Sequence, residues 1–263
     1  MSAPSGAAPG PEAGKPNDGH YSYALYADAS MADRFDAMRF SGPIGTMLAE
    51  VQAQVLEEFL GPLDGQSVLD VGTGTGRAAL AMARRGATVT GVDASAEMLR
   101  VARARAEAQH VHVQFEIGDA HHLAFADRSF AAAVSLRVLM HTPDWRRCLS
   151  ELCRVADERV VFDYPAALSA AALQAAGRWG LARLGRRVEA YRVLRHADVR
   201  ATLEACGYRI DRVHRQFVLP IAVHKAVGSR TFTRAVERGL AAVGLRRLFG
   251  SPVTVVAVRC ASS

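Results

Sequence analysis

Two hydrophobic patterns alternate along the chain. Short apolar runs rich in Val, Ile and Ala, the pattern of buried strands, occur at residues 68–71, 87–92, 111–117, 131–136 and 159–162. Between and after them, residues 45–60, 77–85, 141–155 and 197–205 show helical spacing or helix-forming composition. Two further runs, 208–218 and 253–259, predict the last strands. Strands that alternate with helices in this way predict a doubly wound α/β fold with a mostly parallel sheet.

The first predicted strand runs into a glycine-rich turn, Asp70-Val71-Gly72-Thr73-Gly74-Thr75-Gly76. Glycines let the backbone turn sharply and approach a ligand closely, and the helix that follows directs its N–H groups at that ligand. The second strand ends at Asp93, about 20 residues further on, where a carboxylate can bind a ribose. This unit predicts a site for a nucleotide-containing cofactor.

The position of the third glycine distinguishes two cofactor classes. A dinucleotide fingerprint, G-x-G-x-x-G, requires glycine at position 77, where this chain has Arg77. The third glycine is Gly76 instead. The resulting D-x-G-x-G-x-G resembles the first motif of class I S-adenosylmethionine-dependent methyltransferases, and the resemblance continues in the family's order to about Pro165.

The resemblance implies a Rossmann-like, mostly parallel seven-stranded sheet with a C-terminal antiparallel strand and helical additions. It also implies S-adenosylmethionine as the cofactor. By resemblance, Asp70 reaches the cofactor's amino group, Asp93 accepts both ribose hydroxyls, and Asp119 takes the adenine amino group. The full set of cofactor residues expected from the family is Asp70, Gly72, Thr73, Gly74, Gly76, Asp93, Ala94, Met98, Asp119, Ala120, Leu136 and Arg39.

Several of these residues have an alternative structural reading. Asp119 could instead be a turn residue whose side chain hydrogen-bonds its own backbone, and Met98 could instead fill a gap in the hydrophobic core. Ser95 is the expected N-cap of the helix that carries Met98. The sequence alone leaves Met98 open between adenine packing and core packing.

Candidate catalytic residues follow the fourth and fifth strands, because ligands of doubly wound sheets sit outside the carboxyl ends of the strands. His141 could take a proton from an acceptor, or it could pack at the entry to the helix that ends near Val155. Asp163 and Tyr164 could touch the acceptor, or they could serve as a helix cap and a pocket wall. His121 and His122 have no cysteine or carboxylate at metal-ligand spacing nearby, so no metal site is expected.

Composition narrows the class of protein. A chain of 263 residues, 50% hydrophobic and 22% charged, can bury a full core. The four cysteines form no C-x-x-C, so we expect reduced thiols and a cytoplasmic location, with peripheral membrane contact as an option. There is no apolar stretch of about 18 residues, so no membrane span is expected.

The expected organisation is one methyltransferase domain at residues 21–263, preceded by a disordered tail at 1–20. Residues 21–62 form the N-terminal lid and helices, although an amphipathic helix packed on the sheet would explain the 21–40 pattern equally well. Residues 66–165 form the cofactor-binding core. Residues 166–195 and 221–250 are basic helical additions expected to cap the acceptor.

Charge is concentrated in these additions. Residues 166–250 contain 16 Lys or Arg against 5 Asp or Glu, while the whole chain has a net charge of +6. Arg230, Arg234 and Arg238 recur every four residues beside Phe232, Val236, Leu240 and Leu245, which predicts a basic amphipathic helix. Such a helix could rest on an anionic membrane or bind an acidic substrate, or its arginines could be simply solvated. The absence of a basic groove interleaved with aromatic residues argues against nucleic-acid binding.

The expected function is methyl transfer to a small, lipophilic molecule, and the rim resembles that of ubiquinone and menaquinone C-methyltransferases. Two alternatives remain open: a non-catalytic protein that binds S-adenosylmethionine for regulation or assembly, and a nicotinamide-dependent oxidoreductase. The sequence identifies neither the acceptor, nor the methylated atom, nor the oligomeric state.

Overall fold

The computed structural model describes residues 39–172 and 192–261. The expected tail at 1–20, residues 21–38 of the expected lid, and residues 173–191 of the first basic addition lie outside the described residues.

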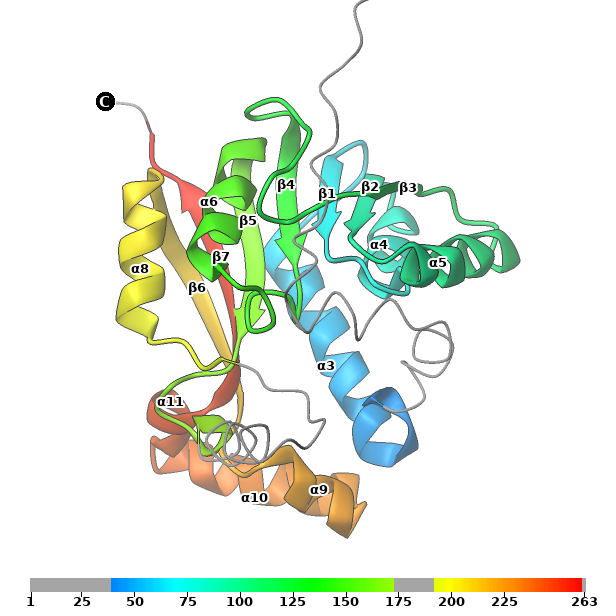
Figure 1. Ribbon diagram of the computed structural model, residues 1–263. Helices are drawn as coiled ribbons and strands as arrows, with labels where there is room; N and C mark the ends of the chain where they lie inside the picture. Colours follow the sequence, from blue (N-terminus) through cyan, green and yellow to red (C-terminus); the bar gives the residue numbers. More distant parts are fainter. Residues whose placement is uncertain (1–38, 173–191, 262–263) are drawn as a thin grey trace, which may run out of the picture.

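A seven-stranded sheet in the order β3-β2-β1-β4-β5-β7-β6 forms the centre of the described structure (Figure 1). Strands β1 to β5 pair in parallel, and β7 pairs antiparallel with both β5 and β6. The strands are β1 (Ser67–Val71), β2 (Thr88–Asp93), β3 (Gln114–Ile117), β4 (Phe130–Ser135), β5 (Ala156–Tyr164), β6 (Tyr208–Phe217) and β7 (Ser251–Arg259). The predicted fold class and the antiparallel C-terminal strand are confirmed.

Helices cover both faces of this sheet. They are α3 (Gly42–Leu60), α4 (Arg77–Ala83), α5 (Ala96–Ala108), α6 (Trp145–Val155), α8 (His196–Ala205), α9 (Ile221–Val227), α10 (Arg230–Ala242) and α11 (Leu245–Phe249). Side chains of a strand alternate between the two faces, so neighbouring strand residues enter different cores. Leu69 packs in the core under α6 and α8, whereas Val68 packs in the core under α3 and α4.

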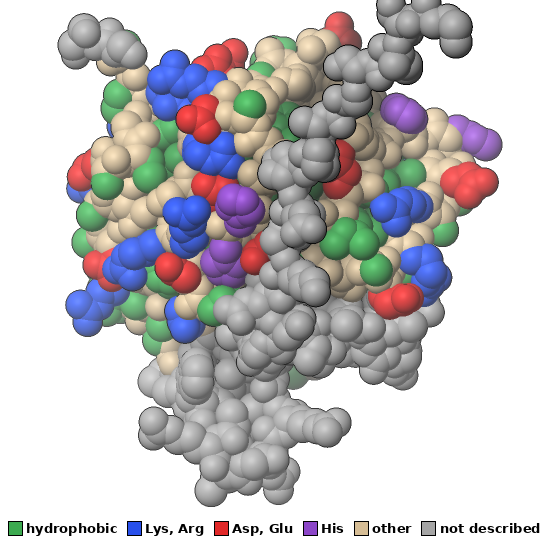
Figure 2. All heavy atoms as spheres, turned by 45° about the horizontal axis from the view of Figure 1, so that its top comes forward, with side chains coloured by type: hydrophobic (Ala, Val, Ile, Leu, Met, Phe, Trp, Pro, Cys, Tyr) green, Lys and Arg blue, Asp and Glu red, His purple; other side chains and the backbone are tan. Residues whose placement is uncertain are grey.

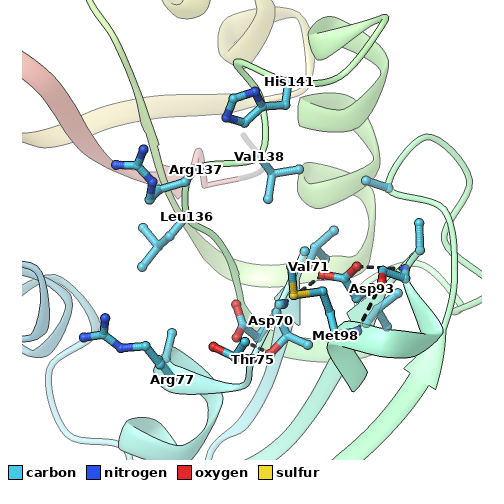
Figure 3. Close-up of a pocket in the computed structure, with 18 of the residues that line it drawn as sticks. Asp70, Val71, Thr75, Arg77, Asp93, Met98, Leu136, Arg137, Val138 and His141 are labelled. Atoms are coloured by element: carbon cyan, nitrogen blue, oxygen red, sulfur yellow. Dashed lines mark hydrogen bonds between the residues drawn. The ribbon is translucent and has the colours of Figure 1, made fainter. Parts of the chain in front are cut away.

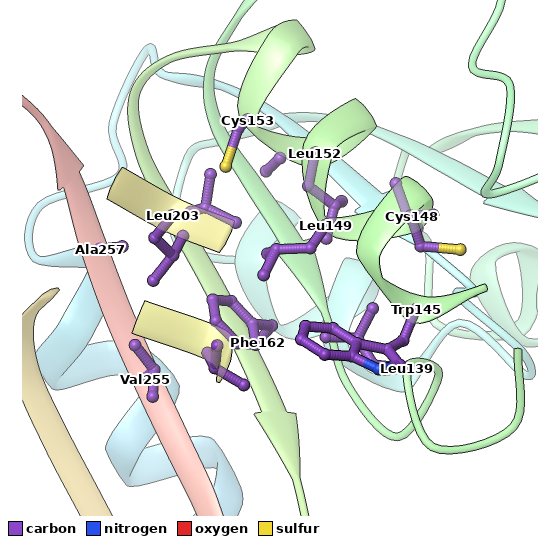
Figure 4. Packing of buried hydrophobic residues seen from close by; sticks show 14 of the residues in the cluster. Leu139, Trp145, Cys148, Leu149, Leu152, Cys153, Phe162, Leu203, Val255 and Ala257 are labelled. Atoms are coloured by element: carbon purple, nitrogen blue, oxygen red, sulfur yellow. The ribbon is translucent and has the colours of Figure 1, made fainter. Parts of the chain in front are cut away.

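The larger core lies between β5, β7, α6 and α8. Trp145, Leu149 and Leu152 extend from α6 toward Phe162 of β5, and Leu203 of α8 reaches Val255 and Ala257 of β7 (Figure 4). All of these side chains are buried, so the apolar face of α6 points into this core. This core fixes β5 beside β4, and so fixes the edge at which the chain after β4 leaves the sheet.

Helix starts follow the capping residues in the sequence. Ser95 accepts the N–H of Met98 at 3.1 Å and caps α5, as predicted. Asp144 accepts the N–H groups of Arg146 and Arg147 and caps α6. The helix therefore begins at Trp145, and the expectation of a helix entered at His141 is corrected: His141 lies in the loop before the cap.

Strand β5 is longer than predicted. It continues through Asp163 and Tyr164, which pair with Thr254 and Val253 of β7. The sequence pattern ended the strand at Phe162 because Asp163 is acidic, but pairing with β7 keeps the backbone extended. Asp163 is therefore a strand residue and not a helix cap.

The addition at residues 221–250 forms three helices, α9 to α11, between β6 and β7. Because β7 starts opposite Tyr164, these helices lie at the carboxyl end of β5 (Figure 1). The addition carries six basic residues and one acid, whereas basic and acidic side chains are interspersed on the face seen in Figure 2. Within the part of the chain that the structure describes, no helix is long and apolar enough to cross a membrane.

Candidate active site

A pocket opens at the carboxyl ends of β1, β2 and β4 (Figure 3). The residues before α3 contribute Arg39 and Phe40 to it. Predicted site residues that line it are Arg39, Asp70, Gly72, Thr73, Gly74, Asp93, Ala94, Met98, Ala120, Leu136 and His141. The structure thus brings together eleven side chains and backbone segments that are spread over 100 residues of sequence.

The glycine turn after β1 forms the floor of the pocket. Gly72 has a φ of 71°, which favours glycine, and its N–H donates to the carbonyl of Val92 at 2.7 Å. A Cβ at Gly72 would lie 2.1 Å from Val138 Cγ2, whereas a Cβ at Gly74 would meet nothing within 4 Å. Gly72 therefore lets two segments pack closely, and Gly74 leaves open space on the pocket side.

Gly76, the third glycine of the motif, lies at the start of α4. It does not line the pocket, and a Cβ there would lie 3.1 Å from Ala102 of α5 and 3.2 Å from Phe115 of β3. With a φ of 77° it begins α4. The third glycine of the motif thus serves helix packing in this chain.

Asp70 is buried beneath the turn. Thr73 Oγ1 donates to its carboxylate at 2.7 Å. Desolvation raises the pKa of Asp70 to about 6, and the Thr73 hydrogen bond opposes that rise. A cationic group placed above Asp70 would offset the cost of its burial.

Asp93 is held by backbone donors on both carboxylate oxygens. The N–H of Gly74 donates to Oδ2 at 2.8 Å, and the N–H of Ser95 donates to Oδ1 at 2.9 Å. Each oxygen keeps a second lone pair, so the fixed carboxylate can accept two further hydrogen bonds from a diol. Burial raises the pKa of Asp93, and these backbone donors oppose that rise.

Apolar groups form the wall beside Asp93. Met98 is 2% exposed, and it lines the pocket together with Ala94, Gly118 and Ala120. Asp119, between Gly118 and Ala120, directs its carboxylate at His121: it accepts the backbone N–H at 2.9 Å and lies 2.7 Å from Nδ1. Its side chain is thus engaged by a neighbour, and its flanking residues face the pocket.

Guanidinium groups also face the pocket. Arg39, Arg77 and Arg137 all line it, and the Arg77 guanidinium lies 3.6 Å above the ring of Phe40. In Figure 3, Arg77 and Arg137 lie away from Asp93 and Met98. The Asp93 carboxylate and these two guanidinium groups therefore lie on different sides of the pocket.

The three catalytic candidates are placed differently. His141 is 5% exposed and lines the pocket near Arg137 and Val138. Asp163 does not line it, because its Oδ1 accepts the backbone N–H of Arg137 at 2.5 Å. Tyr164 is fully buried with its hydroxyl 2.6 Å from His196 Nδ1, away from the pocket.

Several lining residues were not predicted. Phe40, Gln52, Thr75, Arg77, Arg137, Val138 and Thr142 also face the pocket. Thr75 lies inside the glycine motif, and Arg137 to Thr142 follow the fourth strand. Both segments come directly after a predicted strand, so the sequence could have indicated that they line the pocket. Among the described residues, no three His, Cys, Asp or Glu side chains form a metal-binding group.

Comparison with known proteins agrees with this geometry. Residues 68–158 match the family model described as a methyltransferase domain. No curated protein sequence matches the chain.

Solved structures share the fold at low sequence identity. Magnesium protoporphyrin IX methyltransferase from Synechocystis PCC 6803, with bound SAH, is 20% identical, with a TM-score of 0.65 over 90% of this chain and 98% of that one. Geranyl diphosphate C-methyltransferase from Streptomyces coelicolor is 18% identical, with a TM-score of 0.62 over 81% of this chain and 80% of that one. The [4+2]-cyclase SpnF is 22% identical, with a TM-score of 0.58 over 81% of each chain.

Proposed function

We propose that this chain is a class I S-adenosylmethionine-dependent methyltransferase and that it methylates a small, lipophilic acceptor that enters the pocket between Arg137 and His141. The observation that carries the proposal is Asp93. Its two oxygens are fixed by backbone N–H groups beside the glycine turn, and both face a wall of small and apolar residues. That arrangement fits a ribose with an adenine beside it.

The remaining residues fit the rest of the cofactor. Met98, Ala94 and Ala120 suit the adenine ring. The buried Asp70 carboxylate suits the amino group, whose positive charge would offset the desolvation of Asp70. Arg39 suits the carboxylate end, because a guanidinium fork matches carboxylate geometry. When bound, the sulfonium supplies the activated methyl group.

The protein's own contribution is to position and desolvate the acceptor. Leu136 and Val138 form an apolar surface beside His141, and this surface limits the access of water to the reacting atoms. A neutral His141 can accept a proton from an acceptor hydroxyl or acidic carbon, and it can also act only as a wall. Tyr164, with its hydroxyl at His196, is assigned to packing.

A labelling experiment tests the class of acceptor. The protein is incubated with methyl-labelled S-adenosylmethionine and a mixed extract of small metabolites, the unreacted cofactor is removed by chromatography, and the label in the remaining products is measured separately in the organic and aqueous phases. We expect label in the organic phase with the wild type and none with Asp93→Ala. Label only in the aqueous phase would contradict a lipophilic acceptor. Cofactor binding without label in either phase would favour the non-catalytic alternative.

The helices α9 and α10 are proposed to cap the acceptor end. Lys225 Nζ donates to the carbonyl of Arg39 at 3.1 Å, and Arg230 Nε donates to the carbonyl of Pro43 at 3.0 Å. Arg230 also pairs with Glu50 of α3 at 2.7 Å. These contacts link the addition to the segment that brings Arg39 and Phe40 to the pocket.

A second proposal is that this addition contacts an anionic membrane. Large apolar side chains of residues 221–250 are exposed, notably Val243 at 70% and Leu248 at 62%, and the same segment exposes Arg234, Arg238, Arg246 and Arg247. Apolar area and adjacent positive charge together favour an anionic lipid surface. Such contact would bring a lipophilic acceptor close to the pocket.

Vesicle sedimentation tests this contact. We expect binding to vesicles that contain phosphatidylserine, with less binding in high salt and none to neutral vesicles. Replacing Arg234, Arg238, Arg246 and Arg247 by Gln should abolish binding, while Arg84→Gln and Arg103→Gln, remote from the addition, should not. Equal binding to neutral vesicles, or none to either, would contradict it.

A further inference from the structure

Arg137 has an unusual backbone conformation for a residue that lines a pocket. Its φ is 64°, and the other described non-glycine residues with positive φ are His110 and Arg128. Those two lie in exposed turns, where such a conformation is easily accommodated. A non-glycine residue held there inside a site costs free energy that the surrounding structure must offset, so its placement calls for a reason.

Asp163 holds Arg137 in this conformation. Its Oδ1 accepts the Arg137 N–H at 2.5 Å, and the carboxylate is only 4% exposed. Asp163 comes from β5 and Arg137 follows β4, two strands that pair as far as Ser135 and Phe162. A buried carboxylate on the neighbouring strand thus sets the direction in which the chain, and the Arg137 side chain, enters the pocket.

Two guanidinium groups act on the Asp163 carboxylate. Burial raises the pKa of Asp163, whereas the Arg137 and Arg39 guanidinium groups act to lower it. Two guanidinium groups therefore face one carboxylate on the Arg137 side of the pocket. The other two carboxylates, which line the pocket, already accept hydrogen bonds, Asp70 from Thr73 and Asp93 from backbone N–H groups. The Arg137 side of the pocket therefore suits an anion.

Figure 3 places Arg137 on the same side as His141, beyond Leu136 and Val138 and away from Asp93. A guanidinium there can form two parallel hydrogen bonds to the oxygens of a carboxylate or phosphate. An anionic group bound at that point would fix the acceptor at one end and leave its other end over the apolar surface of Leu136 and Val138. This combination suits an acceptor with an apolar body and an acidic end.

We propose that Arg137, positioned by Asp163, binds a carboxylate or phosphate of the methyl acceptor. This inference rests on the proposed function, since it places an acceptor beside the cofactor. Arg39 serves the carboxylate of the cofactor, and Arg137 serves the anion of the acceptor. The two arginines therefore differ in the ligand that they recognise.

A pair of ligands separates the two arginines. S-Adenosylhomocysteine carries the amino-acid carboxylate, and 5′-methylthioadenosine lacks it. We expect Arg39→Gln to weaken binding of S-adenosylhomocysteine at least tenfold and to leave methylthioadenosine within threefold. Arg137→Gln should leave both within threefold. If Arg137→Gln weakens S-adenosylhomocysteine alone by tenfold, Arg137 is a cofactor residue and the proposal is overturned.

Probe anions test the acceptor role directly in the protein saturated with S-adenosylhomocysteine. The Nε–Hε signal of Arg137 in 15N-arginine-labelled protein, identified by its loss in Arg137→Gln, is followed by NMR. Benzoate or phenyl phosphate should shift this signal to saturation in the millimolar range, and neutral benzamide and phenol should not. An unmoved signal, or an equal shift with the neutral probes, would overturn the proposal. Failure to saturate with S-adenosylhomocysteine would instead overturn the proposed function.

Two substitutions at Asp163 test the positioning role. Both remove its negative charge, but Asp163→Asn keeps an oxygen for the Arg137 N–H, whereas Asp163→Ala does not. We expect Asp163→Asn to retain the response to benzoate and Asp163→Ala to lose it, with both still binding S-adenosylhomocysteine. A full response in Asp163→Ala would show that Asp163 does not position Arg137, and a loss in both variants would show that an oxygen for the Arg137 N–H is not sufficient.

Discussion

Individual residues of the glycine turn have separable roles. Gly72 permits the close approach of Val138, Gly74 leaves open space in the pocket, and Gly76 permits the approach of α5. The repeating motif in the sequence could predict the turn, but it could not predict which glycine has which of these roles. The division depends on which segments pack against each glycine, and those segments are distant in sequence.

Gly72→Ala should destabilise the protein more than Gly207→Ala. Both glycines have positive φ, which costs a non-glycine residue about 1–2 kcal/mol. A Cβ at Gly207 meets nothing within 4 Å, whereas one at Gly72 overlaps Val138, and overpacking adds about 1–3 kcal/mol. Urea unfolding of the two variants measures the difference. Equal losses would contradict the packing role of Gly72.

Asp70 should make both stability and ligand affinity depend on pH. Its pKa in the folded protein, about 6, lies above its usual value, so folding favours the protonated form. The ligand-free protein therefore loses stability as pH rises from about 4 to 6, by an amount on the order of 3 kcal/mol. At pH 8 the Asp70→Asn variant should therefore be more stable than the wild type, and this difference in the free energy of unfolding should disappear near pH 4.

The same residue should act in the opposite sense on binding. An ionised Asp70 favours a cationic amino group, so affinity for S-adenosylhomocysteine should fall in the wild type as pH drops below about 6. Asp70→Asn should bind more weakly with no such change. Calorimetric titrations between pH 5 and 8 measure this, and a parallel decline in both proteins would exclude Asp70 as its source.

At the scale of elements, the addition between β6 and β7 packs through polar groups. Its inward positions on α10 are Thr233 and Glu237, and both are buried. Glu237 accepts the N–H groups of Val218 and Leu219 at 2.9 and 3.0 Å, and lies 2.9 Å from His224 Nε2. Thr233 Oγ1 lies 3.1 Å from His224 Nδ1. The chain leaving β6 is thus secured by one carboxylate.

This polar packing explains why the predicted amphipathic helix was only partly right. The prediction placed an apolar stripe beside arginines, and Arg234 and Arg238 are exposed, whereas Arg230 is half-buried and pairs with Glu50. However, Phe232 remains 39% exposed, because the docking face is set by the donors at the end of β6. Such donors belong to the backbone and cannot be identified from side-chain periodicity.

Glu237→Ala should cost about 3 kcal/mol or more of stability, because it leaves the buried His224 and two half-buried backbone N–H groups without an acceptor. Glu237→Gln keeps one oxygen and should cost less. Arg238→Ala, exposed on the same helix, should change stability by less than about 0.5 kcal/mol. Thermal unfolding ranks the three variants, and a neutral Glu237→Ala would show that the network is not needed for docking.

The core elements were the most predictable part of the fold. Val, Ile and Ala runs mark β1, β2 and β4 within one or two residues, because parallel strands buried on both faces have a continuous apolar sequence. β5 was predicted too short, since Asp163 interrupts its pattern. The carboxylate has a buried partner, the Arg137 N–H, and the sequence gives no sign of that bond.

At the scale of the whole molecule, the pocket joins two regions with different predictability. Asp70, Asp93 and the glycines lie on one βαβ unit, so local spacing indicated them. Arg39, Arg137 and His141 come from segments about 100 residues apart, and only the sheet order brings them together. The cofactor end follows from a motif, whereas the acceptor end follows from the assembled fold.

Calorimetric titration with S-adenosylhomocysteine tests the central claim most directly. We predict micromolar binding to the wild type, no response to NADH, and a loss of about tenfold or more in Asp93→Ala, because shielded charge-assisted hydrogen bonds contribute about 1.5–3 kcal/mol each. Glu107→Ala, an exposed acid on α5, is the matched control and should bind as the wild type does. Binding unchanged in Asp93→Ala, or a response to NADH in place of S-adenosylhomocysteine, would contradict the account.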